Sequence, residues 1–203
     1  MRRTTLFETS NPSPPLDNLG ALLESCGAVL HGHFLLSSGR HSEVYFEKFR
    51  VLERADVLST LCGEIASAFA ASGVELVAGP TTGGIIIAFE VARRLGVPAL
   101  YVEREDGKRL LRRGASVPPG ARTLIVDDVL TTGLSVVETI DLVQDNGGSV
   151  VGVGVLIDRS GGKVDFGTPM HAAFKVDAES WAPEDVPDWL AQVPITKPGT
   201  RPG

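Results

Sequence analysis

The sequence has few cysteines, a deficit of positive charge and no long apolar run, and each shortage excludes a class of protein. Only Cys26 and Cys62 occur among its 203 residues, in neither a CxxC pair nor a disulfide framework, so ordinary buried thiols in a reducing cytoplasm are the simpler interpretation. The formal net charge is −6, which argues against duplex nucleic acid or an anionic membrane as the main partner, because both favour a basic face. A small anionic ligand could still bind where the local charge is positive.

The apolar runs are too short for a membrane span, which needs about 18 or more consecutive apolar residues. The N-terminal stretch "MRRTTLFETSNPSPP" has basic residues but lacks the apolar segment of a secretory signal. The tail "ITKPGTRPG" is typical of a loose terminus. Because 203 residues make about one domain with a sizeable core, we expect one soluble, cytoplasmic domain over residues 1–203.

Short apolar strands alternate with amphipathic helices through the middle of the chain. Strands are expected at 74–79, 97–104, 122–126 and 149–157, and helices at 54–71, 84–95 and from about 134 to 145. This alternation predicts an α/β fold, a Rossmann-like parallel sheet flanked by helices on both faces. In such sheets a ligand binds beyond the carboxyl ends of the strands.

The two ends of the chain have a different pattern. Residues 16–26 resemble one amphipathic helix, and "HFLLSSGRHSEVYF" (33–46) a strand and turn. Residues 163–193 are mixed, with two tryptophans and several prolines. We therefore predict a core at about 50–160 and a small cap, or hood, built from about 15–48 and 163–193.

The stretch "TLIVDDVLTTGLSV" (123–136) puts two adjacent carboxylates, Asp127 and Asp128, at the expected ligand edge. The following "TTGLS" joins a strand to a helix, where unpaired backbone N–H groups, hydroxyls and the helix dipole suit a phosphate monoester. The lysine of a GxxxxGK[ST] loop is missing, which disfavours a nucleoside triphosphate held by that device. Carboxylates can accept hydrogen bonds from the vicinal hydroxyls of a ribose. The two features together predict a sugar phosphate site, and the alternative for the acids is a solvated turn.

This stretch closely resembles the phosphoribosyl diphosphate (PRPP) signature of type I phosphoribosyltransferases. The segments "GHFLLSSGRHS" (32–42), "GPTTGG" (79–84) and "VGVLIDRSGG" (153–162) resemble those of orotate phosphoribosyltransferases. The resemblance implies the type I phosphoribosyltransferase fold, a homodimer and a role in pyrimidine biosynthesis. The implied reaction is that of orotate with PRPP to give orotidine 5′-monophosphate and diphosphate, with Mg²⁺ as cofactor.

The resemblance also implies roles for individual residues. The expected catalytic residues are Asp127, Asp128 and Lys108. The expected PRPP contacts are Arg104, Lys108, Asp127, Asp128, Val129, Leu130, Thr131, Thr132, Gly133, Leu134 and Ser135. The expected orotate contacts are Thr131 and Arg159. No residue is assigned as a metal ligand.

Residues 103–114, "EREDGKRLLRRG", mix both charges and would otherwise be a solvated connection. In the family that this chain resembles, the matching region is a mobile loop that closes over the neighbouring subunit's active site. Arg104 and Lys108 would then act in trans on the leaving diphosphate. The chain departs from the common bacterial form, whose loop carries more lysine and a histidine, and from the many relatives that have lysine at the place of Ser37.

Arg159 and the "GPTTGG" segment each have a purely structural explanation as well as a functional one. The guanidinium of Arg159 matches the planar carboxylate of orotate, but it could also form a surface ion pair with Asp158 or a neighbour. "GPTTGG" could be a second amide-rich loop facing the diphosphate, or mere turn chemistry. The histidines are interpreted as structural or surface residues, because the pyrimidine nitrogen itself attacks the sugar. They are His31, His33, His41 and His171.

Two other functions stay open on the sequence alone. A purine phosphoribosyltransferase would share the phosphate cradle but build a different base pocket, and Arg159 and "HFLLSSGR" are the features that discriminate between the two enzymes. A regulatory protein could keep the fold to sense PRPP or nucleotide and could bind RNA, although the acidic charge weakens that reading.

Overall fold

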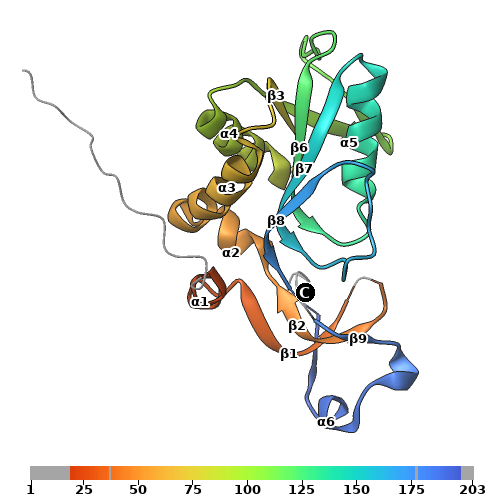
Figure 1. The fold of residues 1–203 in the computed structure, drawn as a ribbon. Helices are drawn as coiled ribbons and strands as arrows, with labels where there is room; N and C mark the ends of the chain where they lie inside the picture. The colour runs from red at the N-terminus through yellow and green to blue at the C-terminus, as the bar shows by residue number, and fades with distance from the viewer. Residues whose placement is uncertain (1–18, 37, 177, 198–203) are drawn as a thin grey trace, which may run out of the picture.

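The computed structural model describes residues 19–36, 38–176 and 178–197, which form a larger and a smaller sheet (Figure 1). The larger sheet has the strand order β5-β4-β3-β6-β7-β8. Its strands are β3 (Leu76–Pro80), β4 (Ala99–Glu105), β5 (Lys108–Leu110), β6 (Arg122–Leu130), β7 (Ser149–Asp158) and β8 (Met170–Lys175). Neighbouring strands are parallel except β5, which pairs antiparallel with β4 at the edge. The predicted α/β fold with a parallel sheet is confirmed.

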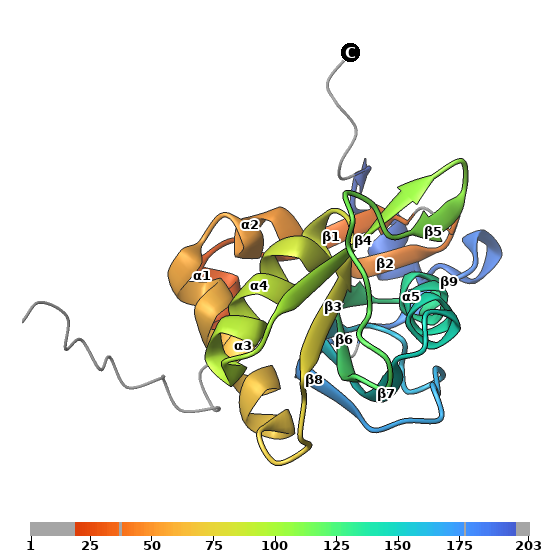
Figure 2. The ribbon, with the colours of Figure 1, turned by 90° about the horizontal axis from the view of Figure 1, so that it is seen from above.

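Helices cover both faces of the larger sheet (Figure 2). α3 (Ala55–Phe69) and α4 (Gly83–Leu95) pack on one face and α5 (Leu134–Asp145) on the other. Each face has its own apolar core, which is why the strands between them are apolar on both sides. α4 ends at Gly96, whose φ of 71° is left-handed and suits glycine.

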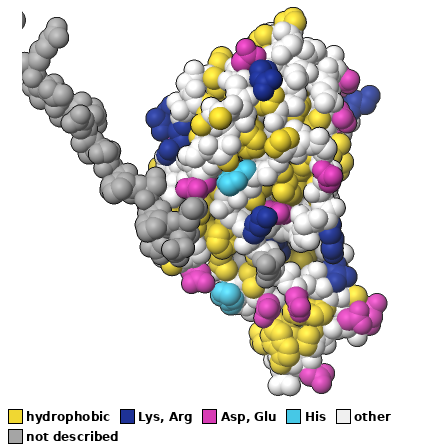
Figure 3. Space-filling model, in the orientation of Figure 1, with side chains coloured by type: hydrophobic (Ala, Val, Ile, Leu, Met, Phe, Trp, Pro, Cys, Tyr) yellow, Lys and Arg dark blue, Asp and Glu magenta, His cyan; other side chains and the backbone are white. Residues whose placement is uncertain are grey.

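The smaller sheet joins segments from both ends of the chain in the order β10-β1-β2-β9. β1 (Val29–Leu35) and β2 (His41–Phe46) form an antiparallel pair, and β9 (Ser180–Trp181) and β10 (Ile195–Thr196) add at its two edges. We call these four strands, with η2 (Pro183–Asp185) and α6 (Asp188–Ala191), the cap. Figure 3 shows hydrophobic side chains gathered at the far end of the cap, with acidic side chains around them.

Two short helices join the cap to the core. α1 (Leu19–Ser25) precedes β1, and its Leu19 and Leu23 are buried in the same apolar core as α3 and α4. α2 (Lys48–Leu52) follows β2 directly and packs on α3. Within the described residues, no helix is both long and apolar enough to cross a membrane.

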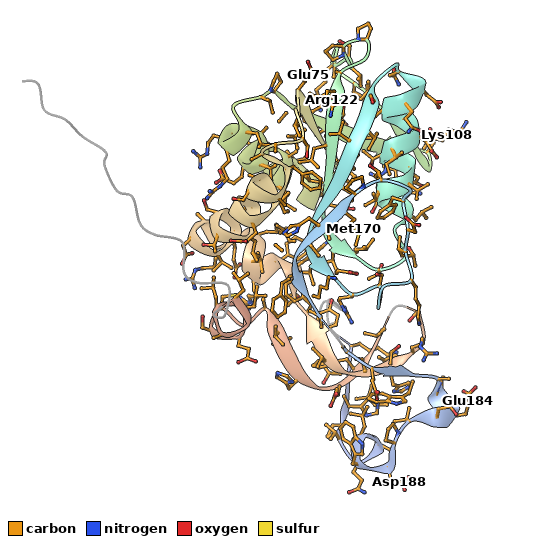
Figure 4. The ribbon with its side chains drawn as sticks, viewed as in Figure 1. Glu75, Lys108, Arg122, Met170, Glu184 and Asp188 are labelled. Atoms are coloured by element: carbon orange, nitrogen blue, oxygen red, sulfur yellow. The ribbon has the colours of Figure 1, made fainter. Side chains whose placement is uncertain are left out.

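The carboxyl ends of the parallel strands face the cap. Glu75 and Arg122 lie at the amino ends of β3 and β6, far from the cap in Figure 4, where the Arg122 backbone N–H donates to Glu75 Oε2 at 2.9 Å. β3, β6 and β7 run from that end toward the cap. The predicted ligand edge is therefore the junction between the two sheets.

Two boundaries differ from the expectation. β6 ends at Leu130 and not at residue 126, because its pairing with β7 continues until Leu130 lies opposite Asp158. β8 falls within the range predicted for the cap, but it pairs with β7 in the larger sheet. Of the helix predicted at 16–26, the structure has α1 at Leu19–Ser25. Residues 1–18 and 198–203 lie outside the described residues.

Candidate active site

Asp127 and Asp128 lie inside β6, and both are buried. Their exposed fractions are 6% and 7%, because β7 continues to pair with the strand beside and beyond them. The alternative of a solvated turn is therefore wrong. Two adjacent buried carboxylates carry a large desolvation cost unless each has a partner, and adjacent residues of a strand point to opposite faces of the sheet. The two acids accordingly have different surroundings.

Asp127 faces the N-terminus of α5. The Ser135 hydroxyl donates to Asp127 Oδ2 at 2.5 Å, and the Asp128 backbone N–H donates to Asp127 Oδ1 at 2.8 Å. Burial, with the neighbouring charge of Asp128, raises the pKa of Asp127 to about 6. The Ser135 hydroxyl, expected as a donor to phosphate, is thus already bonded to an acid of the pair.

Asp128 faces α4 and α2. Lys48 Nζ lies 2.8 Å from Asp128 Oδ2, and the Val129 backbone N–H donates to Oδ1 at 2.7 Å. Oδ2 lies so close to Gly83, the first residue of α4, that a Cβ atom added there would be 2.1 Å from it. Asp128 is therefore held on two sides, by an ammonium group and by a glycine that leaves room for it.

The "TTGLS" segment is open to a ligand at the start of α5. Thr131 and Thr132 are exposed, and Gly133 has a φ of 78°, with no side-chain hydrogen bond capping the helix. A Cβ on Gly133 would also lie 2.9 Å from Val164 Cγ1, so glycine is required for both conformation and space. Because no side chain of the described residues caps α5, its first N–H groups can bind an anion.

The "GPTTGG" segment is built by close packing. A Cβ on Gly79 would lie 2.4 Å from the Gly84 carbonyl oxygen, and one on Gly84 would lie 2.8 Å from Pro80 Cδ. These glycines let the end of β3 and the start of α4 approach each other beside Asp128. The segment contains a cis peptide between Thr81 and Thr82. Its position at the carboxyl end of β3 is that expected of a ligand loop, and the close approach explains its glycines better than turn chemistry alone.

Arg159 follows β7 at the same edge of the sheet. Its backbone N–H donates to the Leu130 carbonyl at 2.8 Å, which ties it to the end of β6. Within the described part of the chain, its half-buried guanidinium makes no hydrogen bond or ion pair. Asp158 Oδ1 instead accepts hydrogen bonds from the backbone N–H and the hydroxyl of Ser160, so the predicted alternative of an Asp158–Arg159 pair is wrong. Burial lowers the pKa of Arg159, and Tyr45 is the nearby group that opposes this shift.

Comparison with known proteins identifies this arrangement. The phosphoribosyl transferase domain family matches residues 54–183. An orotate phosphoribosyltransferase of Pelotomaculum thermopropionicum is 49% identical over 185 residues, which cover 91% of this chain and 97% of the relative. The chain belongs to the orotate phosphoribosyltransferase family.

Solved structures of this family have the same fold. The orotate phosphoribosyltransferase of Aeropyrum pernix is 32% identical, with a TM-score of 0.67 over 78% of this chain and 93% of that one. The enzyme of Mycobacterium tuberculosis, solved in complex with PRPP, is 26% identical, with a TM-score of 0.63 over 80% and 96%. The type I phosphoribosyltransferase fold predicted from the signature is confirmed.

In this family member the basic segment 103–114 contains the turn and the second strand of a β-hairpin formed by β4 and β5. β4 turns at Asp106 and Gly107, both at positive φ, into β5. Arg104 and Arg109 both pair with Glu138 of α5, at 3.1 and 3.0 Å. The remaining arginines pair within the hairpin, Arg112 with Glu105 and Arg113 with Glu103. Most residues of the segment are nevertheless exposed, as expected of a solvated connection.

Lys108 and Arg104 are exposed, whereas the two acids are buried. Lys108 is exposed beside the turn of the hairpin, and Figure 4 shows it at the outer edge of the molecule near α5. Arg104 is bonded to Glu138 within its own chain. The structure thus brings together Asp127, Asp128, the "TTGLS" segment and Arg159 at one edge of the sheet. Among the described residues, Arg104 pairs with Glu138 and not with either acid.

The sequence reasoning missed two residues at this site. Lys48 contacts Asp128, and Tyr45 lies near Arg159, with its pKa raised chiefly by burial. Neither belongs to a motif; the only available signal was that both follow the "SGRHS" segment. Ser37 lies outside the described residues. Among the histidines, His33 is buried in the cap, where its Nε2 lies 2.6 Å from Nδ1 of His41.

Proposed function

We propose that the protein transfers the phosphoribosyl group of PRPP to orotate, giving orotidine 5′-monophosphate and diphosphate in pyrimidine biosynthesis. The observation that carries this proposal is the half-buried guanidinium of Arg159, which has no anionic partner in the described residues and lies at the same sheet edge as the acid pair. A cation that is partly removed from water without a counter-charge favours an anionic ligand. The carboxylate of orotate supplies that charge, whereas a neutral purine does not.

PRPP would lie along the carboxyl ends of β6 and β7. Residues 129–135, with the free N–H groups at the start of α5, would hold the 5′-phosphate. Asp127 and Asp128 would accept hydrogen bonds from the ribose hydroxyls, because each oxygen keeps an unused lone pair beside its present bond. Thr131, exposed at the end of β6, would contact both the phosphoribosyl group and the base.

The reaction needs no nucleophilic side chain. The pyrimidine nitrogen attacks the anomeric carbon while the bond between that carbon and the diphosphate oxygen breaks. Positive charge that develops on the sugar is stabilised by the two carboxylates, and negative charge on the departing diphosphate by cations. Asp127 and Asp128 fit the first role because they are fixed before substrate binds.

Magnesium fits this site as an ion that arrives with PRPP. Among the described residues, no three His, Cys, Asp or Glu side chains are grouped to hold a metal, and Mg²⁺ commonly keeps its waters and binds through substrate phosphates. When bound, it neutralises charge on the diphosphate. We propose Mg²⁺ as the cofactor and assign no ligand to it.

A homodimer is the assembly that we propose, with the hairpin of one subunit acting at the site of the other. Ile86 and Phe89 lie one turn apart on α4 and are 46% and 62% exposed, and Phe49 on α2 is 60% exposed. Large apolar side chains that remain exposed on helices are typical of a surface covered by a partner. Lys108, on the hairpin that follows β4, is free to reach a neighbour.

Mixing two inactive variants tests this arrangement. One is Asp127→Asn/Asp128→Asn, which has an intact hairpin, and the other is Arg104→Ala/Lys108→Ala, which has an intact acid pair. After subunit exchange we expect about a quarter of the parent activity, since half of the dimers would then contain one complete site of two. A mixture that stays as inactive as its components would mean that the hairpin acts within its own chain or not at all.

Turnover with a panel of bases tests the function itself. We expect diphosphate release from PRPP with orotate and Mg²⁺, and none with adenine, hypoxanthine or guanine. The purine phosphoribosyltransferase alternative predicts the reverse pattern. PRPP binding without turnover of any base would favour the regulatory alternative.

We further propose a cytoplasmic location and a single catalytic domain. Cys26 and Cys62 are free thiols, which supports a reducing compartment. Arg40 of the cap donates from Nε to Ser180 Oγ at 2.9 Å, and Lys48 ties the segment after β2 to Asp128. The second of these contacts supports a site that lies between the cap and the larger sheet of one domain.

A further inference from the structure

The ion pair between Lys48 and Asp128 joins α2, which follows the cap strand β2, to β6 of the larger sheet. Lys48 is the first residue of α2, which begins directly after the cap strand β2. Asp128 lies near the end of β6, 80 residues further along. The pair is therefore a direct link between the cap and the acids of the proposed PRPP site.

The geometry of this pair fixes the carboxylate of Asp128. Lys48 Nζ binds Oδ2 at 2.8 Å and the Val129 backbone N–H binds Oδ1 at 2.7 Å. Gly83 closes the third side, since its Cα leaves no space for a Cβ beside Oδ2. With both oxygens bonded and one face blocked, the carboxylate has one orientation, and its unused lone pairs point away from these three groups.

The exposure of the two side chains suggests that the ion pair does more than stabilise the fold. The Asp128 side chain is 10% exposed, whereas that of Lys48 is 40% exposed. A lysine that only joined two buried surfaces would be covered with its partner. Lys48 instead keeps part of its side chain exposed while it pairs with the acid, at the junction where the ligand is expected. Within the described residues no cation forms an ion pair with Asp127, which is held by the Ser135 hydroxyl.

We propose that Lys48 is a positioning residue for phosphoribosyl transfer, which holds the Asp128 carboxylate in the orientation that receives the ribose of PRPP. This inference rests on the proposed function and adds to it a residue outside the PRPP signature. Lys48 acts through Asp128, together with Gly83. Because only Glu47 separates Lys48 from β2, the position of the cap over the site also sets the position of Asp128.

The test compares Lys48→Met and Lys48→Arg with Arg50→Met. Arg50 lies on the same helix and, among the described residues, pairs only with the exposed Glu53, at 2.9 Å, so its loss controls for removal of a cation from α2. We expect Lys48→Met to lower kcat on the order of tenfold to a hundredfold, as misplacement of a reacting group does. The KM for PRPP should change much less. Lys48→Arg should recover most of kcat, and Arg50→Met should match the parent.

A second variant approaches Asp128 from the other side. Gly83→Ala keeps the lysine but displaces Oδ2, so it should show the same loss of kcat with little change in KM. Three results would each overturn the proposal: a kcat for Lys48→Met within about twofold of the parent, equal rates for the Met and Arg variants, or a rise in the KM for PRPP larger than the fall in kcat. The last result would indicate direct contact between Lys48 and PRPP.

The assay separates this inference from the proposed function. The parent is first measured with the panel of bases, and a parent that does not use orotate contradicts the proposed function. The Lys48 variants are then compared on whichever base the parent accepts. If no base is accepted, calorimetric titration with PRPP decides, and a weakening by Lys48→Met larger than that by Asp128→Asn would overturn the positioning role.

Discussion

The Asp127→Asn/Asp128→Asn variant is expected to lose phosphoribosyl transfer while it keeps its fold. Asparagine preserves the size of each side chain but removes the negative charge that would face the developing cation of the sugar. Removal of one fixed electrostatic group from an active site commonly lowers kcat on the order of 10² to 10³. We expect a fall of at least that size here, measured as diphosphate release at saturating PRPP and orotate.

The Asp127→Asn single variant should be more stable than the parent at neutral pH, although it should be less active. Burial and Asp128 raise the pKa of Asp127 to about 6, so the folded state favours the protonated acid and is penalised once the acid ionises. The penalty is absent below pH 4, grows as the pH rises from about 4 to 6, and is complete above 6, where it amounts to roughly 3 kcal/mol. Urea unfolding should therefore find the variant more stable than the parent at pH 8, and the difference should vanish at pH 4.

The matched control is Asp141→Asn/Asp145→Asn, which changes the net charge equally at two exposed positions of α5. It should leave both kcat and stability near those of the parent. Unchanged turnover in the Asp127→Asn/Asp128→Asn variant would reject the assignment of these acids. An equal loss in the control would mean that overall charge, and not position, governs the rate.

The alternation of strands and helices could be predicted because it depends on local pattern. Buried parallel strands are apolar on both faces, and helices repeat every 3.6 residues, so each element is visible in its own segment. β6 was predicted too short for the same reason. Asp127 and Asp128 look like the end of a strand, but the hydrogen bonds that continue β6 come from β7, whose register is set elsewhere in the sequence.

The partners of the acids could not be predicted, because they come from distant segments. Nothing near Lys48 marks it as a partner of Asp128, and nothing near Glu138 marks it as the acid that Arg104 and Arg109 share. The signature gives the acids and the phosphate loop because those residues are contiguous. The cation that orients Asp128 depends on how α2 packs, and the pairing of the two arginines depends on how the hairpin packs on α5, which only the folded chain determines.

Replacement of Arg159 by alanine is expected to weaken orotate binding far more than PRPP binding. Orotate differs from a neutral pyrimidine by its carboxylate, and Asp127 and Asp128 lie on the sugar side of the site. A cation must therefore balance the base. Arg159 is half-buried and unpaired in the described residues, while Arg40, the other candidate, is already bonded to Ser180.

The expected size of the effect follows from the burial of that charge. Truncating one partner of a desolvated charged pair costs about 2 to 5 kcal/mol, so orotate affinity should fall about thirtyfold or more, measured by calorimetric titration into the folded variant. PRPP affinity should change little, and Arg159→Lys should be intermediate because it keeps the charge but loses the planar fork. Arg54→Ala, which breaks an exposed pair with Asp56, should alter neither ligand, since such pairs contribute roughly 0 to 1 kcal/mol. If orotate binds Arg159→Ala as tightly as it binds the parent, Arg159 is not the carboxylate partner and Arg40 becomes the residue to replace.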